Sequence, residues 1–164
     1  MLLFLVGFMG SGKTFIGDYM TGNYGFKCLH MDAEIERREK MKISDIFSTK
    51  GEAVFRDLEV ALLKEAIEVK KAQLVICGGG LGINEPSQTL MVKKGLKVFL
   101  DTPKDECWKR VSTQSVVRPL ATCRESFMQL HRSRFTAYIK GAHVIDGSLN
   151  EKAIAEKLMV LSRK

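Results

Sequence analysis

The chain has 164 residues, the length of a single domain, and 45% of them are hydrophobic, enough to form a buried core. With only three prolines and 14 glycines, the composition excludes a disordered or collagen-like chain. The formal net charge of +7 favours anionic partners, namely phosphorylated small molecules, nucleic acid or an acidic membrane surface, without choosing among them.

Two further features narrow the class of protein. The apolar run at residues 1–8 is too short to cross a bilayer and lacks the basic region and the cleavage site of a secretory signal. The four cysteines contain no CxxC pair, so neither a zinc site nor a dense disulfide framework is indicated. We therefore expect a cytoplasmic protein with no membrane partner.

Short apolar runs alternate with longer amphipathic segments along the chain. The apolar runs predict five strands, at residues 2–6, 28–31, 73–77, 96–101 and 143–145. The other segments predict helices that begin near residue 13, cover residues 32–40, 43–47, 52–69, 104–111 and 124–140, and resume near residue 150. Asp32 is expected to be an N-cap and Pro103 to lie in a first helical turn. This alternation predicts a mostly parallel sheet with helices on both faces and ligands at the carboxyl ends of its strands.

Residues 7–14, GFMGSGKT, match the P-loop pattern GxxxxGK[ST] between an apolar strand and a helix. Glycines let the backbone direct its N–H groups at phosphate oxygens, and the helix N-terminus adds partial positive charge. Lys13 is expected to bridge the β- and γ-phosphates, and the Thr14 hydroxyl to coordinate Mg²⁺. The motif predicts binding of a nucleoside triphosphate but does not separate kinases from GTPases or ATPases.

Five more features occur together in this chain. Asp32 follows the second strand, GEAVFR stands at residues 51–56, three glycines at 78–80, RPL at 118–120, and Arg134 precedes Tyr138 by four residues. With these residues and the P-loop, the chain resembles the shikimate kinase family from residue 2 to about residue 144.

The resemblance implies the fold and the reaction. The expected fold is a three-layer α/β P-loop kinase with a five-stranded parallel sheet in the order 2-3-1-4-5. Residues 1–164 would form one kinase domain, with an acceptor-binding subdomain at about 32–62 and a lid at about 112–124. The expected activity is transfer of the γ-phosphoryl group of ATP, with Mg²⁺, to the 3-hydroxyl of shikimate by a monomer.

The resemblance also assigns roles on the acceptor side. Asp32 would hold the acceptor hydroxyls and orient the attacking oxygen, while Arg56 and Arg134 would clamp the shikimate carboxylate. Gly79 would offer its backbone N–H, and Arg118 would close over the transferring phosphoryl group. These residue types suit the ligand, because guanidinium groups bind carboxylates in a two-pronged geometry and a loose transition state needs positioning and charge neutralisation.

The resemblance places the nucleotide contacts in and around the P-loop. Arg110 resembles an arginine that stacks on adenine in the family. The expected nucleotide-binding residues are Gly10, Ser11, Gly12, Lys13, Thr14, Phe15, Arg110 and Arg118, of which Lys13 and Arg118 would also be catalytic.

The chain departs from the family at His30. The second strand of the family usually ends in Asp-x-Asp, and its first aspartate helps to hold Mg²⁺ through water, whereas His30-Met31-Asp32 stands here. A neutral imidazole supplies no negative charge to a hard cation. We therefore expect Thr14, phosphates and water to hold Mg²⁺, with Asp32 also contributing to its binding. The departure leaves open a degenerate member that binds nucleotide without turnover. Another small-molecule kinase, such as a gluconate or nucleoside kinase, is a second alternative. Nucleic-acid binding has little support because the basic residues are scattered.

Overall fold

A computed structural model describes residues 1–113 and 123–163 of the chain. Its centre is a sheet of five parallel strands in the order β2-β3-β1-β4-β5. The strands are β1 (Leu3–Val6), β2 (Cys28–His30), β3 (Leu74–Ile76), β4 (Leu96–Asp101) and β5 (His143–Asp146). The α/β class and the strand order expected from the sequence are confirmed.

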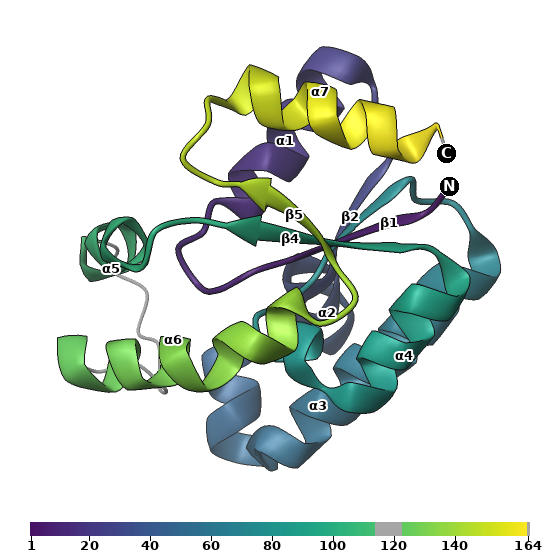
Figure 1. Ribbon diagram of the computed structural model, residues 1–164. Coiled ribbons are helices and arrows are strands. Elements are labelled where there is room, and N and C mark those ends of the chain that lie inside the picture. The colour runs from purple at the N-terminus through teal and green to yellow at the C-terminus, as the bar shows by residue number, and fades with distance from the viewer. Residues whose placement is uncertain (114–122, 164) are drawn as a thin grey trace.

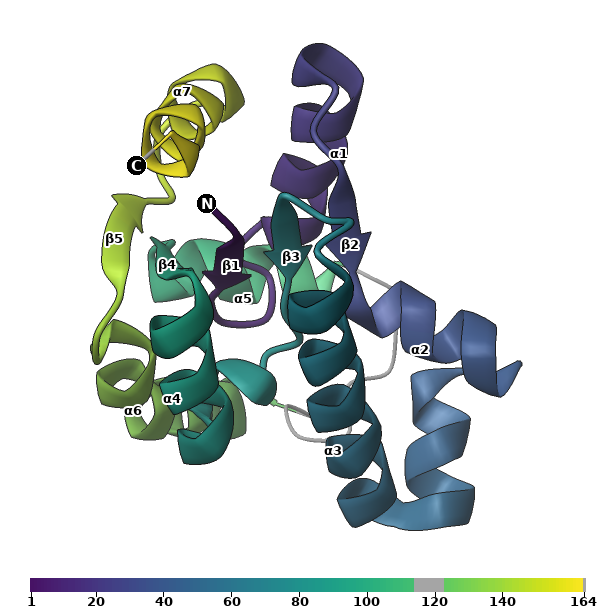
Figure 2. The same ribbon diagram turned by 90° about the vertical axis from the view of Figure 1, so that its right-hand side faces the viewer.

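Helices cover the sheet on both faces and make three layers (Figures 1 and 2). On one face lie α1 (Lys13–Tyr24) and α7 (Glu151–Ser162). The other face carries α3 (Ile43–Val69), α4 (Glu85–Lys94) and α6 (Arg124–Ile139), with α2 (Met31–Glu39) packed beside α3. The short α5 (Lys104–Ser112) lies at the end toward which the strands point, opposite the two termini.

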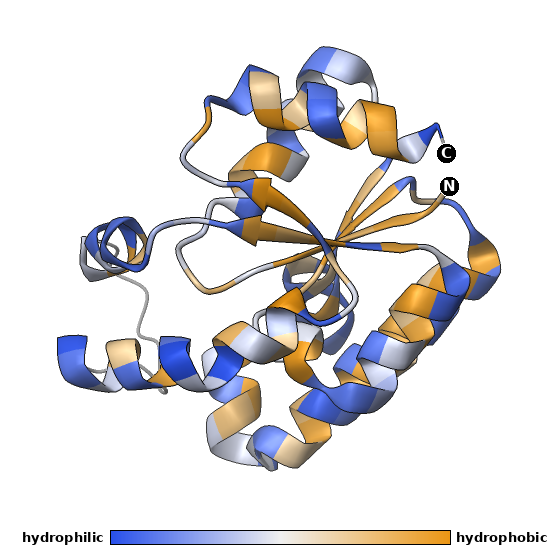
Figure 3. Ribbon diagram, in the orientation of Figure 1, coloured by the Kyte–Doolittle hydropathy of each residue, from blue (hydrophilic) through white to orange (hydrophobic). Residues whose placement is uncertain are grey.

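The alternation of strand side chains builds two apolar cores, one for each face of the sheet. Leu3 and Leu5 of β1 pack with the buried side of α1 and α7, whereas Phe4 and Val6 pack with α3, α4 and α6. All four side chains are fully buried, and most of the length of the central strands is hydrophobic in Figure 3. This central strand therefore anchors the P-loop that follows it.

Two predicted helix starts need correction. Asp32 is not an N-cap: β2 passes directly into α2, His30 takes the cap position, and Asp32 lies in the first turn. Pro103 is the N-cap residue of α5 rather than a first-turn residue. The two predicted helices at 43–47 and 52–69 are confirmed: they are the two arms of α3, separated at Gly51, whose φ of 86° and ψ of 164° are not helical.

One helical region was not predicted. Between β3 and β4 the chain forms a 3-10 turn, η1 (Leu81–Ile83), and then α4. Asn84 caps α4 by accepting a hydrogen bond from the Ser87 backbone, and Pro86 stands in the first turn. In the described part of the chain, no helix is both long and apolar enough to span a membrane.

Candidate functional site

The P-loop connects β1 to α1 at the carboxyl end of the sheet. Gly10 and Gly12 have positive φ values of 78° and 97°, which suit glycine. A Cβ atom on Gly10 would overlap the carbonyl oxygen of Cys107 in α5, so a side chain there would separate the loop from α5. The first residues of α1 follow at once, and the Ile16 backbone donates to the Gly12 carbonyl at 3.0 Å.

The Lys13 ammonium lies inside this loop. Its Nζ donates to the carbonyl oxygens of Gly7 at 2.8 Å and Phe8 at 2.9 Å, and to the Ser11 hydroxyl at 3.3 Å. The loop therefore holds a cation at the head of the central strand, where the positive end of the α1 dipole also points. Such a site favours a polyanion.

Arg110 of α5 braces the same loop. Its Nη1 donates to the carbonyls of Gly10 at 3.2 Å and Ser11 at 3.3 Å, while Nη2 pairs with Glu106 at 2.7 Å. Thr102 also donates to the Ser11 carbonyl, at 2.8 Å. Arg110 thus lies beside the P-loop. Two further residues expected to contact the nucleotide, Thr14 and Phe15, are exposed at the start of α1.

Two carboxyl groups meet at the end of β3. A Cβ atom on Gly78 would come within 2.6 Å of both Asp32 Oδ1 and Glu59 Oε1, so these oxygens flank the same point of the backbone. Asp32 comes from the first turn of α2 and Glu59 from the second arm of α3. Glycine at position 78 makes this close approach possible.

Arg56 lies against the next part of the loop of three glycines at residues 78–80, called the glycine loop below. A side chain on Gly80 would overlap its guanidinium group. Arg56 pairs with Glu59 at 2.6 Å and Glu52 at 2.7 Å, and its guanidinium carbon lies 5.3 Å from the centre of the Phe55 ring. Burial lowers the pKa of Arg56, but the two carboxylates outweigh this and raise it, so the group stays charged.

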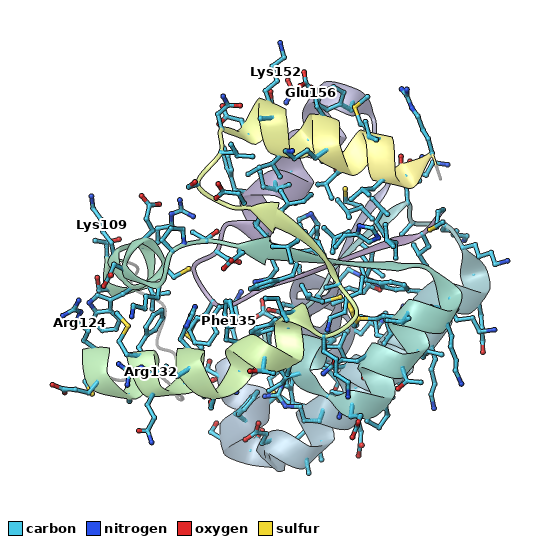
Figure 4. The ribbon with its side chains drawn as sticks, viewed as in Figure 1. Lys109, Arg124, Arg132, Phe135, Lys152 and Glu156 are labelled. Atoms are coloured by element: carbon cyan, nitrogen blue, oxygen red, sulfur yellow. The ribbon has the colours of Figure 1, made fainter. Side chains whose placement is uncertain are left out.

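Helix α6 brings Arg134 and Tyr138 to the other side of the glycine loop. The Tyr138 hydroxyl donates to the Gly79 carbonyl at 2.5 Å. Burial raises the Tyr138 pKa to about 12, although a hydrogen bond with Arg134 opposes the rise. Arg134 Nη1 lies 4.0 Å from the position that a Cβ of Gly79 would take. Arg132, labelled in Figure 4, is exposed, whereas Arg134 is half-buried.

Glu59 belongs to this cluster and was not singled out from the sequence. Its side chain is 1% exposed, and burial raises its pKa to about 7 despite the hydrogen bond from Arg56. Among the described residues its Oε1 has no hydrogen-bond partner. The signal was present in the sequence: position 59 lies on the apolar stripe of Phe55, Leu62 and Leu63 and is three residues after Arg56.

The remaining site predictions concern His30 and Arg118. His30 ends β2, and its Nε2 lies 3.3 Å from Asp18 Oδ1 on α1, one helical turn beyond Thr14. The ring packs against Gly17, where a Cβ would come within 2.7 Å of it. Arg118 and most of the predicted lid lie outside the described residues.

Comparisons with known proteins agree with this arrangement. The family model described as "Shikimate kinase" matches residues 9–161. A curated shikimate kinase of Persephonella marina is 36% identical over 136 residues, which are 83% of this chain and 82% of that protein. The shikimate kinase of Aquifex aeolicus has a crystal structure that superposes with a TM-score of 0.81 at 31% identity, covering 98% of this chain and 94% of that one.

A shikimate kinase of Acinetobacter baumannii, solved in complex with shikimate, superposes with a TM-score of 0.85 at 30% identity, covering 99% of this chain and 93% of that chain. A gluconokinase of Sinorhizobium meliloti superposes with a TM-score of 0.58 at 11% identity over 99% of this chain and 91% of that one, which shows a shared fold alone. The P-loop, the paired carboxyl groups and the two arginines at the glycine loop thus occur in a chain that belongs to the shikimate kinase family.

Proposed function

We propose that this protein transfers the γ-phosphoryl group of ATP to the 3-hydroxyl of shikimate, giving shikimate 3-phosphate and ADP. The observation that carries the proposal is the convergence of Arg56 and Arg134 on the Gly79-Gly80 backbone, from two different helices. Two guanidinium groups next to a glycine backbone suit a small carboxylate, and the carboxyl group of Asp32 beside Gly78 suits its hydroxyls.

On the nucleotide side, the P-loop would bind the triphosphate through its backbone and the N-terminus of α1. Lys13, now bonded to loop carbonyls, would turn its ammonium to the β- and γ-phosphates and offset the charge of the transition state. We assign Gly10, Ser11, Gly12, Thr14, Phe15 and Arg110 to nucleotide binding, and Arg118 to closure over the transferring group.

On the acceptor side, Asp32 would orient the attacking hydroxyl and accept its proton late in the reaction. A strong base is not required, because the loose transition state of phosphoryl transfer depends mainly on alignment. Arg56 and Arg134 would fix the acid end of the ring, and the Gly79 N–H would add a further contact. Glu59, buried beneath Arg56, would hold that guanidinium in place.

The residues near the loop fit Mg²⁺ held largely by the nucleotide. The exposed Thr14 hydroxyl is the hard oxygen ligand that this ion prefers, whereas the imidazole of His30 is not. We propose that Thr14 binds Mg²⁺ directly, with Asp32 acting through water. Bound there, the ion would neutralise charge on the β- and γ-phosphates.

We also propose how the chain is organised in the cell. Residues 1–164 would form one domain, in which residues 32–62 bind the acceptor and residues 112–124 form a lid that excludes water. The protein would act as a cytoplasmic monomer, as the family resemblance suggests. Light scattering during size-exclusion chromatography should then give the mass of one chain.

The proposed role of Asp32 is tested by Asp32→Asn. Removing the carboxylate should lower shikimate-dependent ADP release by about a hundredfold or more, because alignment and proton acceptance are both lost. ATP affinity, measured by titration calorimetry without Mg²⁺, should stay within about twofold, because Asp32 lies on the acceptor side. Unchanged turnover would remove Asp32 from the mechanism.

The same assay separates the proposed enzyme from a degenerate relative, an alternative prompted by His30. A shikimate kinase should release ADP only when shikimate is present. Tight ATP binding with near-zero release, whether or not shikimate is added, would instead identify a nucleotide-binding protein without turnover.

A further inference from the structure

Lys97 is a fully buried lysine at the second position of β4, a strand that is otherwise apolar up to its final aspartate. It pairs in register with Phe4 of β1 and lies on the face of the sheet that is covered by α4 and α6. None of the roles derived above uses it. A buried ammonium group is costly to retain, so its contacts define what it does.

All three acceptors of the Lys97 ammonium are neutral. Its Nζ donates to the backbone carbonyls of Ala137 at 2.9 Å and Lys140 at 3.1 Å, and to the Gln88 side chain at 3.2 Å. Ala137 and Lys140 stand at the carboxyl end of α6, where carbonyl groups lack helical partners and the helix dipole is negative. Lys97 therefore caps α6 from inside the protein.

The charge persists at neutral pH. Burial lowers the pKa of Lys97 to about 8, and the nearby Lys140 side chain acts in the same direction, whereas Cys77 opposes it. An ammonium group with a pKa near 8 is mainly protonated at pH 7, so the cap carries a positive charge under ordinary conditions.

The capped end of α6 lies close to Arg134, the residue of this helix that is proposed to bind the acid. Ala137 is three residues after Arg134 and directly before Tyr138, whose hydroxyl bonds the Gly79 carbonyl. Phe99, two residues after Lys97 on the same face of β4, stacks on the Tyr138 ring with centroids 5.4 Å apart and planes 6° apart. Phe135, which faces the sheet in Figure 4, meets Phe99 edge-on at 5.9 Å. Thus β4 fixes both the rotation and the axial position of α6.

We propose that Lys97 is a positioning residue for shikimate, an inference that rests on the proposed function: by holding the carbonyls of Ala137 and Lys140, it sets α6 so that Arg134 reaches the acid. Lys97 does not touch the substrate. Loss of its three hydrogen bonds leaves the apolar contacts of α6 in place and frees the helix to shift along its axis. Small shifts of this kind weaken a two-pronged carboxylate contact.

The test is Lys97→Met, which keeps the length of the side chain and removes the ammonium. The KM for shikimate and its calorimetric Kd should rise about tenfold, because Arg134 is no longer held in place. The KM for ATP, and kcat at saturating shikimate, should stay within about twofold. Leu158→Ala is the control: this buried residue packs on the opposite face of the sheet, so it should lower Tm without changing the KM for shikimate.

A double-mutant cycle separates positioning from general loss of stability. If Lys97 acts through Arg134, Lys97→Met should weaken shikimate binding far less in an Arg134→Gln background than in the wild type. Equal losses in both backgrounds would overturn the proposal. So would an unchanged shikimate KM in a folded Lys97→Met protein.

If Lys97→Met does not fold, Gln88→Met tests the same contact from α4. Removing one of the three acceptors should raise the KM for shikimate about twofold to threefold with the KM for ATP unchanged, and no change would count against the proposal. Failure of the proposed function has a different signature, because wild-type protein would then show no shikimate binding at all.

Discussion

Glu59 has a buried carboxyl group whose ionisation couples stability to pH. Its pKa rises from an ordinary 4.5 to about 7 because burial disfavours the charge more than Arg56 favours it. The folded protein therefore holds a proton that the unfolded chain releases. Between about pH 4.5 and pH 7, this residue makes stability fall as pH rises.

Glu59→Gln should remove this contribution. The amide cannot ionise, so the difference in unfolding free energy between variant and wild type should move in favour of the variant between pH 5 and pH 7, by at most about 1.4 kcal/mol per pH unit. Urea denaturation at several pH values measures the difference. A constant difference across this range would show that Glu59 does not titrate there.

His30 is the residue at which the chain departs from its family, and it too can be tested singly. His30→Asp places a carboxylate at the end of β2, in addition to the Asp18 carboxylate 3.3 Å from the present imidazole. Added negative charge should lower the Kd for Mg²⁺ in the presence of ADP by about threefold or more. Asp18→Asn, which removes the carboxylate on α1 beside His30, should not tighten Mg²⁺ binding. If His30→Asp and wild type bind Mg²⁺ with equal affinity, the hypothesis that His30 weakens the hold of the site on Mg²⁺ is wrong.

At the scale of elements, the glycine loop after β3 lets two helices approach the same backbone. Gly80→Ala should force Arg56 of α3 away, because the new methyl group would occupy the space of its guanidinium. Shikimate affinity should fall about tenfold or more, while ATP affinity stays the same. Gly22→Ala is a matched control: its Cβ would meet nothing within 4 Å, and alanine should stabilise the interior of α1. Equal shikimate affinity in both variants would show that Arg56 does not bind the acid.

Some helices and strands could be predicted from the sequence and others could not. The β1 strand, P-loop and α1 were predictable because a continuous apolar run, glycines and a lysine stand in a fixed order. By contrast, α4 has few apolar residues, so local periodicity missed a helix whose start depends on the Asn84 cap. The first turn of α2 begins at Met31 because β2 enters the helix without a loop.

Some residues of the site could likewise be predicted from the sequence, and others could not. Asp32, Arg56 and Arg134 stand in recognisable motifs, and the structure brings them to one glycine loop. Glu59 and Lys97 did not stand out because a charged residue in an amphipathic or strand segment usually points to solvent. Only tertiary packing, which buries both, reveals their partners.

At the scale of the whole molecule, the two apolar cores share one sheet, so we expect a single cooperative unit. Thermal unfolding should show one transition, and an excess of ADP or shikimate should shift all of it upward. At a ligand concentration of 100 times Kd the gain should be about 2.7 kcal/mol. Two transitions, of which a ligand moves only one, would contradict a single kinase domain.

The most direct test of the account is calorimetric titration of shikimate, and separately of gluconate, into the protein with nucleotide present. We predict that shikimate binds, that gluconate gives no heat of binding, and that Arg56→Gln or Arg134→Gln each weaken shikimate binding at least about tenfold with nucleotide affinity unchanged. The assignment of this site would be contradicted if gluconate bound as tightly as shikimate. It would also be contradicted if neither arginine substitution changed the affinity for shikimate.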